Sequence, residues 1–203
     1  MRIKICGITN YEDAKLCCDC GADALGFIFY EKSKRFVSID EAKSIIQKLP
    51  AFVSKIGVFI NEDSKKINDI AREIKLTGVQ LHGEETPEFA ESILLPVIKG
   101  FRVSEEFDFS ITDKYPGCKF LLDTYSTKEY GGTGQTFDWE IIPMKIRKTI
   151  ILAGGVSSSN IEHIFKTVKP VAVDVSSSLE IKPGIKDESK VKSFFEIFNS
   201  LRR

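Results

Sequence analysis

Residues 3–29, IKICGITNYEDAKLCCDCGADALGFIF, contain one complete strand–helix–strand unit. Ile3–Cys6 is a short run of the kind that forms a buried strand. Asn10 is a favourable N-cap for the helix that follows, and Gly21 is a favourable stop. Ala24–Phe29 then predicts a second strand. The whole stretch therefore predicts two parallel strands joined by a crossover helix.

The same unit recurs through the chain. The predicted strands are Ile3–Cys6, Ala24–Phe29, Lys55–Ile60, Gly78–Leu81, Val97–Lys99, Phe120–Leu122, Thr149–Leu152 and Val171–Val175. Helices are predicted from 38 to 49, where Ser38 and Glu41 form a capping box before Pro50, and at about 64–74, 160–168 and 189–201. Another begins near Pro87. Residues 101–116 are polar and weakly periodic, and only a short helix is predicted around Trp139.

Eight such units close naturally into a barrel. We therefore predict an α/β fold, a single-domain (β/α)8 TIM barrel over residues 1–203, compact, with weak or shortened helices after strands 5 and 6. A doubly wound open sheet is the alternative. No G-x-G-x-x-G motif follows the first strand, which disfavours a dinucleotide-binding sheet of that kind.

The charge balance argues against a polyanionic partner. The 203 residues include 29 Lys and Arg against 29 Asp and Glu. We therefore expect no nucleic-acid partner and no membrane partner. MRIKICGIT has no features of a signal peptide, so a cytoplasmic location is expected.

Five cysteines, an odd number, predict reduced thiols in a chain of this size. Cys17, Cys18 and Cys20 cluster, which raises the alternative of a zinc site. No second pair of cysteines or histidines stands at zinc-site spacing, so cysteines packed on a helix are the favoured interpretation.

Polar or reactive residues follow most of the predicted strands. In a βα barrel these positions meet at one end, where binding and catalysis occur. The candidate site residues are Cys6, Arg35, His82, Asp123, Gly154, Gly155, Asp174, Ser176, Ser177 and Ser178. Taken singly, Cys6 could be a small buried hydrophobe, Asp123 a turn cap and His82 a structural histidine.

Two loops indicate a phosphate site. Gly154-Gly155 follows strand seven and opens a helix, where free backbone N–H groups favour an anion. Ser176-Ser177-Ser178 forms the matching loop after strand eight, and these two loops are the frequent phosphate site of the fold. A tight turn and a polar loop are the bland alternatives. Gly131-Gly132-Thr133-Gly134 lacks the Lys-Ser/Thr of a nucleotide site and is interpreted as a mobile lid or a flexible loop.

Along essentially its whole length the sequence resembles the phosphoribosylanthranilate isomerase family of tryptophan biosynthesis. The motifs that carry the resemblance are Lys4-Ile5-Cys6-Gly7-Ile8-Thr9, Gly26-Phe27-Ile28-Phe29, Ser33-Lys34-Arg35, Gly57-Val58-Phe59, Val79-Gln80-Leu81-His82-Gly83, Leu122-Asp123, Gly131-Gly132-Thr133-Gly134, Phe137-Asp138-Trp139, Ala153-Gly154-Gly155, Val173-Asp174-Val175-Ser176-Ser177, Pro183-Gly184 and Lys186-Asp187. One departure is Ser178-Leu179-Glu180, where the family has glycine before Val-Glu.

The resemblance implies an Amadori rearrangement of N-(5′-phosphoribosyl)anthranilate. It assigns the general acid to Asp123 and the general base to Cys6. Arg35 matches a position near the anthranilate carboxylate, and Gly154, Gly155 and the serine loop match the phosphate site. His82 and Asp174 match active-site positions without an assigned role.

The resemblance also implies that neither a metal nor an organic cofactor is needed, and we expect a monomer or a homodimer that acts on a small phosphorylated substrate. Two rival functions stay open at this point. A Schiff-base aldolase would use Lys99 near the end of strand five. A barrel without activity would serve as a binding or scaffold protein, which retention of both Cys6 and Asp123 disfavours.

Overall fold

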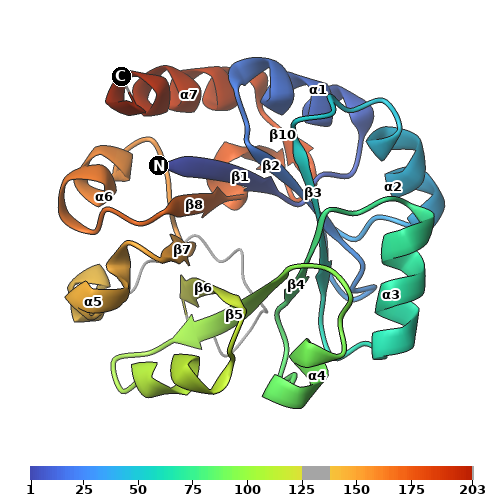
Figure 1. The fold of residues 1–203 in the computed structure, drawn as a ribbon. Helices are drawn as coiled ribbons and strands as arrows, with labels where there is room; N and C mark the ends of the chain where they lie inside the picture. The colour runs from blue at the N-terminus through green and yellow to red at the C-terminus, as the bar shows by residue number, and fades with distance from the viewer. Residues whose placement is uncertain (125–137, 203) are drawn as a thin grey trace.

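Eight parallel strands close into a barrel in the computed structural model, which describes residues 1–124 and 138–202 (Figure 1). The strands are β1 (Arg2–Cys6), β2 (Ala24–Ile28), β3 (Ser54–Phe59), β4 (Gly78–Leu81), β5 (Val97–Val103), β6 (Lys119–Thr124), β7 (Ile150–Leu152) and β8 (Ala172–Val175). β1 pairs with β8, from Arg2 beside Ala172 to Ile5 beside Val175. The predicted (β/α)8 barrel is therefore confirmed, and the open sheet is wrong.

Helices cover the outside of the barrel (Figure 1). They are α1 (Tyr11–Cys20), α2 (Ile39–Ile46), α3 (Ser64–Glu73), α4 (Pro87–Glu91), α5 (Met144–Arg147), α6 (Ile161–Thr167) and α7 (Glu188–Arg202). As predicted, the Asn10 side chain caps α1 by accepting from the Asp13 amide at 2.8 Å. Gly21 ends that helix with φ 107°. α2 ends three residues earlier than predicted, because the amides of Lys48 and Leu49 bond to carbonyls three residues back and form turns before Pro50.

Among the described residues, the helices after β5 and β6 are weak, as predicted. β5 is followed by a 3₁₀ helix, η1 (Phe109–Lys114), and β6 by η2 (Trp139–Ile141) and the short α5. β5 itself runs past the predicted end at Lys99, because its pairing with β6 continues to Val103 beside Thr124. Phe101 packs against Phe107, Tyr115 and Phe120, so aromatic rings cover this part of the barrel instead of a helix.

A small hairpin after β8 was not predicted. The 3₁₀ helix η3 (Ser177–Leu179) leads into β9 (Glu180–Lys182), which pairs antiparallel with β10 (Ile185–Lys186). Gly184 makes the turn with φ 83°, a backbone conformation that favours glycine. The strands are too short for a period-2 pattern, and only the Pro183-Gly184 pair signals them.

The strand register decides which side chains face the barrel interior. Lys4 lies beside Asp174 of β8, and Cys6 lies beside Gly26 of β2. Side chains alternate along a strand, so Lys4 and Cys6 face inward together while Ile5 faces the helices. Leu25 likewise packs outward against the helical layer, where most of the apolar core lies.

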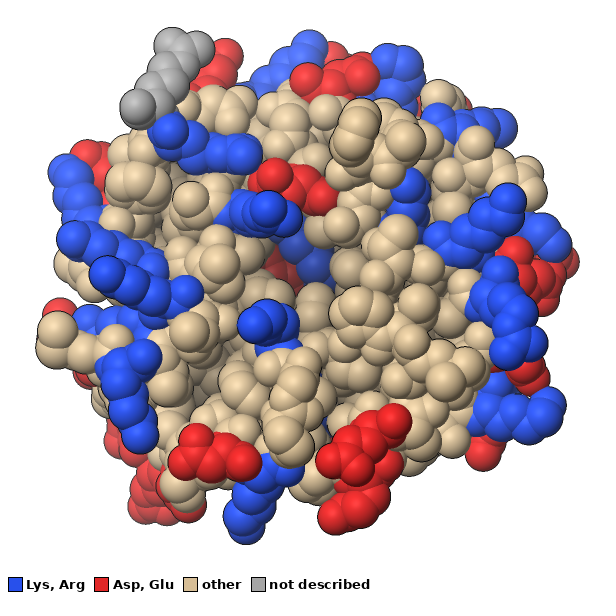
Figure 2. Space-filling model, viewed as in Figure 1, with Lys and Arg blue, Asp and Glu red and all other residues tan. Residues whose placement is uncertain are grey.

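Charged side chains of both signs are mixed over the face drawn in Figure 2. None of the helices within residues 1–124 and 138–202 has the length and apolar character needed to cross a membrane.

Leu25→Ala tests the core between the barrel and its helices. Leu25 is fully buried, so its truncation should lower the free energy of unfolding by about 2–5 kcal/mol. Leu94→Ala is the matched control, because Leu94 is 74% exposed and should change stability by less than about 0.5 kcal/mol. Urea denaturation of both variants measures the difference. Equal effects would contradict this placement of the core.

Candidate active site

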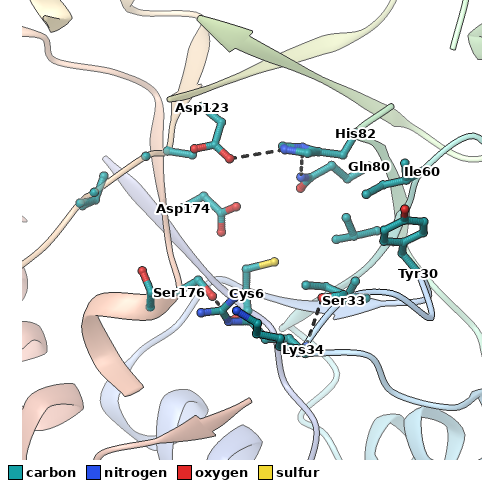
Figure 3. Close-up of a pocket in the computed structure, with 18 of the residues that line it drawn as sticks. Cys6, Tyr30, Ser33, Lys34, Ile60, Gln80, His82, Asp123, Asp174 and Ser176 are labelled. Carbon is teal, nitrogen blue, oxygen red and sulfur yellow. Dashed lines mark hydrogen bonds and ion pairs between the residues drawn. The ribbon is translucent and has the colours of Figure 1, made fainter. Parts of the chain in front are cut away.

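A cavity of about 430 Å³ lies at the carboxyl ends of the strands (Figure 3). The structure brings together nine of the predicted site residues on its walls: Cys6, Arg35, His82, Asp123, Gly154, Gly155, Asp174, Ser176 and Ser177. These residues come from both ends and the middle of the chain, and closure of the barrel brings them together. Ser178, the departure in the serine loop, is not part of the wall.

Asp123 and His82 form a polar pair on one wall. His82 Nε2 lies 3.4 Å from Asp123 Oδ2, and His82 Nδ1 lies 3.0 Å from Gln80 Nε2. The His82 ring is therefore held between the Asp123 carboxyl and the Gln80 amide. The Thr124 amide donates to Asp123 Oδ1 at 2.8 Å. Both oxygens of this carboxyl are thereby oriented.

Cys6 stands on another wall, with its sulfur pointing into the cavity (Figure 3). Burial raises the pKa of the Cys6 thiol, and the ammonium of Lys4 acts in the opposite direction. Lys4 is 4% exposed and binds Asp174 Oδ2 at 2.8 Å. A thiol, an ammonium and a carboxylate are therefore grouped at the floor of the cavity.

Arg35 is held by a buried carboxylate from the hairpin. Its Nε and Nη2 bind Glu180 at 2.7–3.0 Å, and Lys186 Nζ binds the same carboxylate at 2.9 Å. Although burial raises the pKa of Glu180, the hydrogen bonds from Arg35 and Lys186 outweigh it, and the net pKa is lowered. Lys186 Nζ also donates to the Cys6 carbonyl at 2.7 Å. The hairpin thus supports both Arg35 and the end of β1.

The glycine loop after β7 depends on close backbone approach. Gly154 and Gly155 have φ of 74° and 72°. A Cβ on Gly154 would lie 2.2 Å from Thr124 Oγ1 and 2.6 Å from the Thr124 nitrogen. Only glycine satisfies both the conformation and the space at Gly154.

Ser178 fits its position without strain. It is absent from the residues with positive φ within the described ranges, so serine replaces the expected glycine at little conformational cost. Its Oγ donates to the Val156 carbonyl at 2.6 Å. Ser178 therefore ties the serine loop to the glycine loop.

Sequence reasoning missed four residues that shape the site: Lys4, Gln80, Glu180 and Lys186. Lys4 and Gln80 each precede a predicted site residue by two positions in a strand, and this spacing was the available signal. Glu180 and Lys186 depend on the hairpin, which was not predicted.

Other sequence-based interpretations fall outside the cavity. Lys99 does not line it, and its ammonium binds Glu85 at 2.7 Å. Across residues 1–124 and 138–202, His, Cys, Asp and Glu form no group of three placed to hold a metal. The cluster Cys17, Cys18 and Cys20 lies on α1, where burial raises the pKa of Cys17 to about 12. Gly131-Gly132-Thr133-Gly134, the lid hypothesis, lies outside the described residues.

The model of the N-(5′-phosphoribosyl)anthranilate (PRA) isomerase family matches residues 3–197. The N-(5′-phosphoribosyl)anthranilate isomerase of Pelobacter propionicus is 46% identical over 203 residues, covering 100% of this chain and 97% of that protein.

Solved structures show the same likeness. The phosphoribosyl anthranilate isomerase of Thermotoga maritima superposes with a TM-score of 0.91 at 42% identity, covering 98% of this chain and 99% of that one. A phosphoribosyl anthranilate isomerase in complex with reduced 1-(o-carboxyphenylamino)-1-deoxyribulose 5-phosphate superposes with a TM-score of 0.88 at 41% identity, with the same coverage.

Gly100→Ala tests the packing that holds His82. A Cβ on Gly100 would lie 2.4 Å from His82 Nδ1, so the added methyl should lower the free energy of unfolding by about 1–3 kcal/mol. In a His82→Ala background the same methyl has room, and its cost should disappear. Urea denaturation of the two single variants and the double variant completes the cycle. Additive effects would show that Gly100 does not act through His82.

Proposed function

Because the chain belongs to the PRA isomerase family, an enzyme family of tryptophan biosynthesis, we propose that its own acid–base pair is Asp123 and Cys6. The reaction converts N-(5′-phosphoribosyl)anthranilate into 1-(o-carboxyphenylamino)-1-deoxyribulose 5-phosphate. One observation carries the assignment: a carboxyl and a thiol face the same cavity from different walls (Figure 3).

Asp123 opens the sugar ring. Its carboxyl donates a proton to the furanose ring oxygen, the bond from C1′ to that oxygen breaks, and the anthranilate nitrogen forms an iminium with C1′. Proton donation of this type needs a positioned acid. The contacts of Asp123 with His82 and the Thr124 amide support that position. We assign His82 to the orientation of Asp123.

Cys6 takes the second proton. The iminium acidifies C2′, and the Cys6 thiolate removes the C2′ proton. The C–H electrons form the C1′–C2′ double bond and neutralise the iminium nitrogen. The resulting enolamine becomes the ketone when its C2′ hydroxyl loses a proton and C1′ gains one. Because the substrate's own nitrogen supplies the electron sink, this route needs no added cofactor.

Two parts of the cavity fit the ends of the substrate. The loops of Gly154-Gly155 and Ser176-Ser177 offer backbone N–H and hydroxyl donors for the phosphate. Arg35, clamped by Glu180, is assigned to the anthranilate carboxylate, which a guanidinium suits well. With its phosphate and its anthranilate held in this way, the substrate would present its sugar to both the acid and the base.

The sugar hydroxyls would meet two acceptors between those ends. Gln80 Oε1 and Asp174 Oδ1 are buried and lack a hydrogen-bond partner among the described residues. Both residues line the cavity. Buried acceptors are normally satisfied, so a ligand donor at these atoms is expected. We assign them to the ribose hydroxyls, which gives Asp174 a substrate-binding role.

The proposal includes a cytoplasmic enzyme that acts on this small phosphorylated substrate without a nucleic-acid or membrane partner. Neither rival gains support from the site. The aldolase would need a lysine in the cavity, and Lys99 lies elsewhere, bound to Glu85. Turnover by the purified protein would exclude the inactive scaffold.

Cys6→Ser should lower kcat by at least about 10²-fold, because general-base contributions are of the order of 10²–10⁴-fold. KM should change little, since the thiol acts on a carbon-bound proton. Steady-state kinetics with PRA measures both constants. Cys118→Ser is the control, because Cys118 is away from the cavity wall and should keep activity. A Cys6→Ser variant with near-normal kcat would remove Cys6 from the mechanism.

Asp123→Asn should reduce kcat to a similar degree, because an amide does not replace a carboxylic acid as proton donor. Its shape is retained, so the variant should still bind reduced 1-(o-carboxyphenylamino)-1-deoxyribulose 5-phosphate, which calorimetric titration can measure. If turnover and binding fall together, Asp123 positions the substrate and does not act as the acid.

A further inference from the structure

Lys4 is a charged side chain in the interior of the barrel, below the cavity. It is 4% exposed and faces inward with Cys6, two residues along β1. Lysine is rarely buried to this degree unless it is paired. Burial opposes its charge, yet Asp174 and Cys6 together raise the pKa of Lys4, so it remains an ammonium. If position 4 served only to fill the barrel interior, an apolar side chain would be expected there.

Both the Asp174 carboxylate and the Cys6 thiol, the proposed base, lie close to the ammonium. It binds Asp174 Oδ2 at 2.8 Å. It also lies over Gly26, where an added Cβ would meet Cys6 Sγ at 2.8 Å, Lys4 Cε at 2.9 Å and Lys4 Nζ at 3.1 Å. The sulfur and the ammonium therefore occupy the same small space, which exists because residue 26 has no side chain.

We propose that Lys4 is a positioning residue for the reaction: its buried ammonium holds the Cys6 sulfur over Gly26 and favours the thiolate, the form that can accept a proton from carbon. The inference rests on the proposed role of Cys6 as base. Asp174 restrains the ammonium through their 2.8 Å ion pair. Its negative charge disfavours the thiolate, so the two partners of one ion pair act on Cys6 in opposite directions.

Other charged groups surround Cys6. Lys186 binds the Cys6 carbonyl at the end of β1, and its charge also favours the thiolate. Among the described residues, the remaining charged or titratable side chains facing the cavity are Tyr30, Lys32, Lys34, Arg35, His82 and Asp123. Lys4 has the largest lowering effect on the pKa of Cys6, against the larger raising effect of burial.

The test measures the Cys6 thiol directly, without substrate. The rate of alkylation by iodoacetamide is followed against pH, because the thiolate is the reactive form. Mass spectrometry isolates Cys6, since the tryptic peptide that contains it ends at Lys15, before Cys17. Lys4→Met should move the alkylation midpoint up by at least about one pH unit, and Asp174→Asn should move it down.

The opposite directions of the two shifts in the alkylation midpoint distinguish a positioning role from a purely structural one. If the ion pair merely holds the barrel together, removing either partner should shift the midpoint in the same direction, and that result would overturn the proposal. A midpoint unchanged in Lys4→Met would also overturn it. Lys99→Met is the matched control, because it removes a buried ion-paired lysine of another strand and should leave the midpoint unchanged.

Two further measurements make the test decisive. If Lys4→Met does not fold, Asp174→Asn alone still decides, because a midpoint that rises or stays unchanged contradicts the proposal. In kinetics, the acid limb of kcat/KM for PRA should move with the alkylation midpoint. Failure of the wild-type protein to turn over PRA would refute the proposed function while leaving the alkylation result intact.

Discussion

The pairing of β1 with β8 is the constraint on which the site depends. It places Lys4 beside Asp174, 170 positions later in the chain, and orients Cys6 into the cavity. The same closure brings the hairpin after β8 under the end of β1, where Lys186 binds the Cys6 carbonyl. Cys6 is therefore located by contacts with the last quarter of the chain, and an open sheet of the same strands would leave it without them.

Two buried ion-pair groups flank the thiol, and each joins structure to chemistry. Glu180 fixes Arg35 at the cavity wall, and Asp174 fixes Lys4 beneath it. Buried charges contribute little to stability on balance, because desolvation offsets most of their attraction. Here these ion pairs hold Arg35 and Lys4 in fixed positions. The cations gather around the proposed base, whereas the proposed acid lies against His82 on another wall.

Local patterns in the sequence predicted most of this architecture. Caps such as Asn10 and stops such as Gly21 act through neighbouring residues, so the sequence alone reveals them. The end of β5 could not be predicted, because partners in β6 extend it. The site residues at strand ends could be predicted because barrel closure brings the carboxyl ends of all the strands together. Lys4 and Glu180 were missed because their roles depend on partners far away in sequence.

The central claim is that this barrel isomerises PRA with an acid and a base from its own chain. The most direct measurement mixes purified wild-type protein with PRA, follows the loss of substrate fluorescence and determines the product by mass spectrometry. The account predicts rapid loss of substrate and a product of unchanged mass, the deoxyribulose isomer. A folded protein that does not accelerate the loss of PRA beyond its spontaneous decay, or that accelerates the release of free anthranilate, would contradict it.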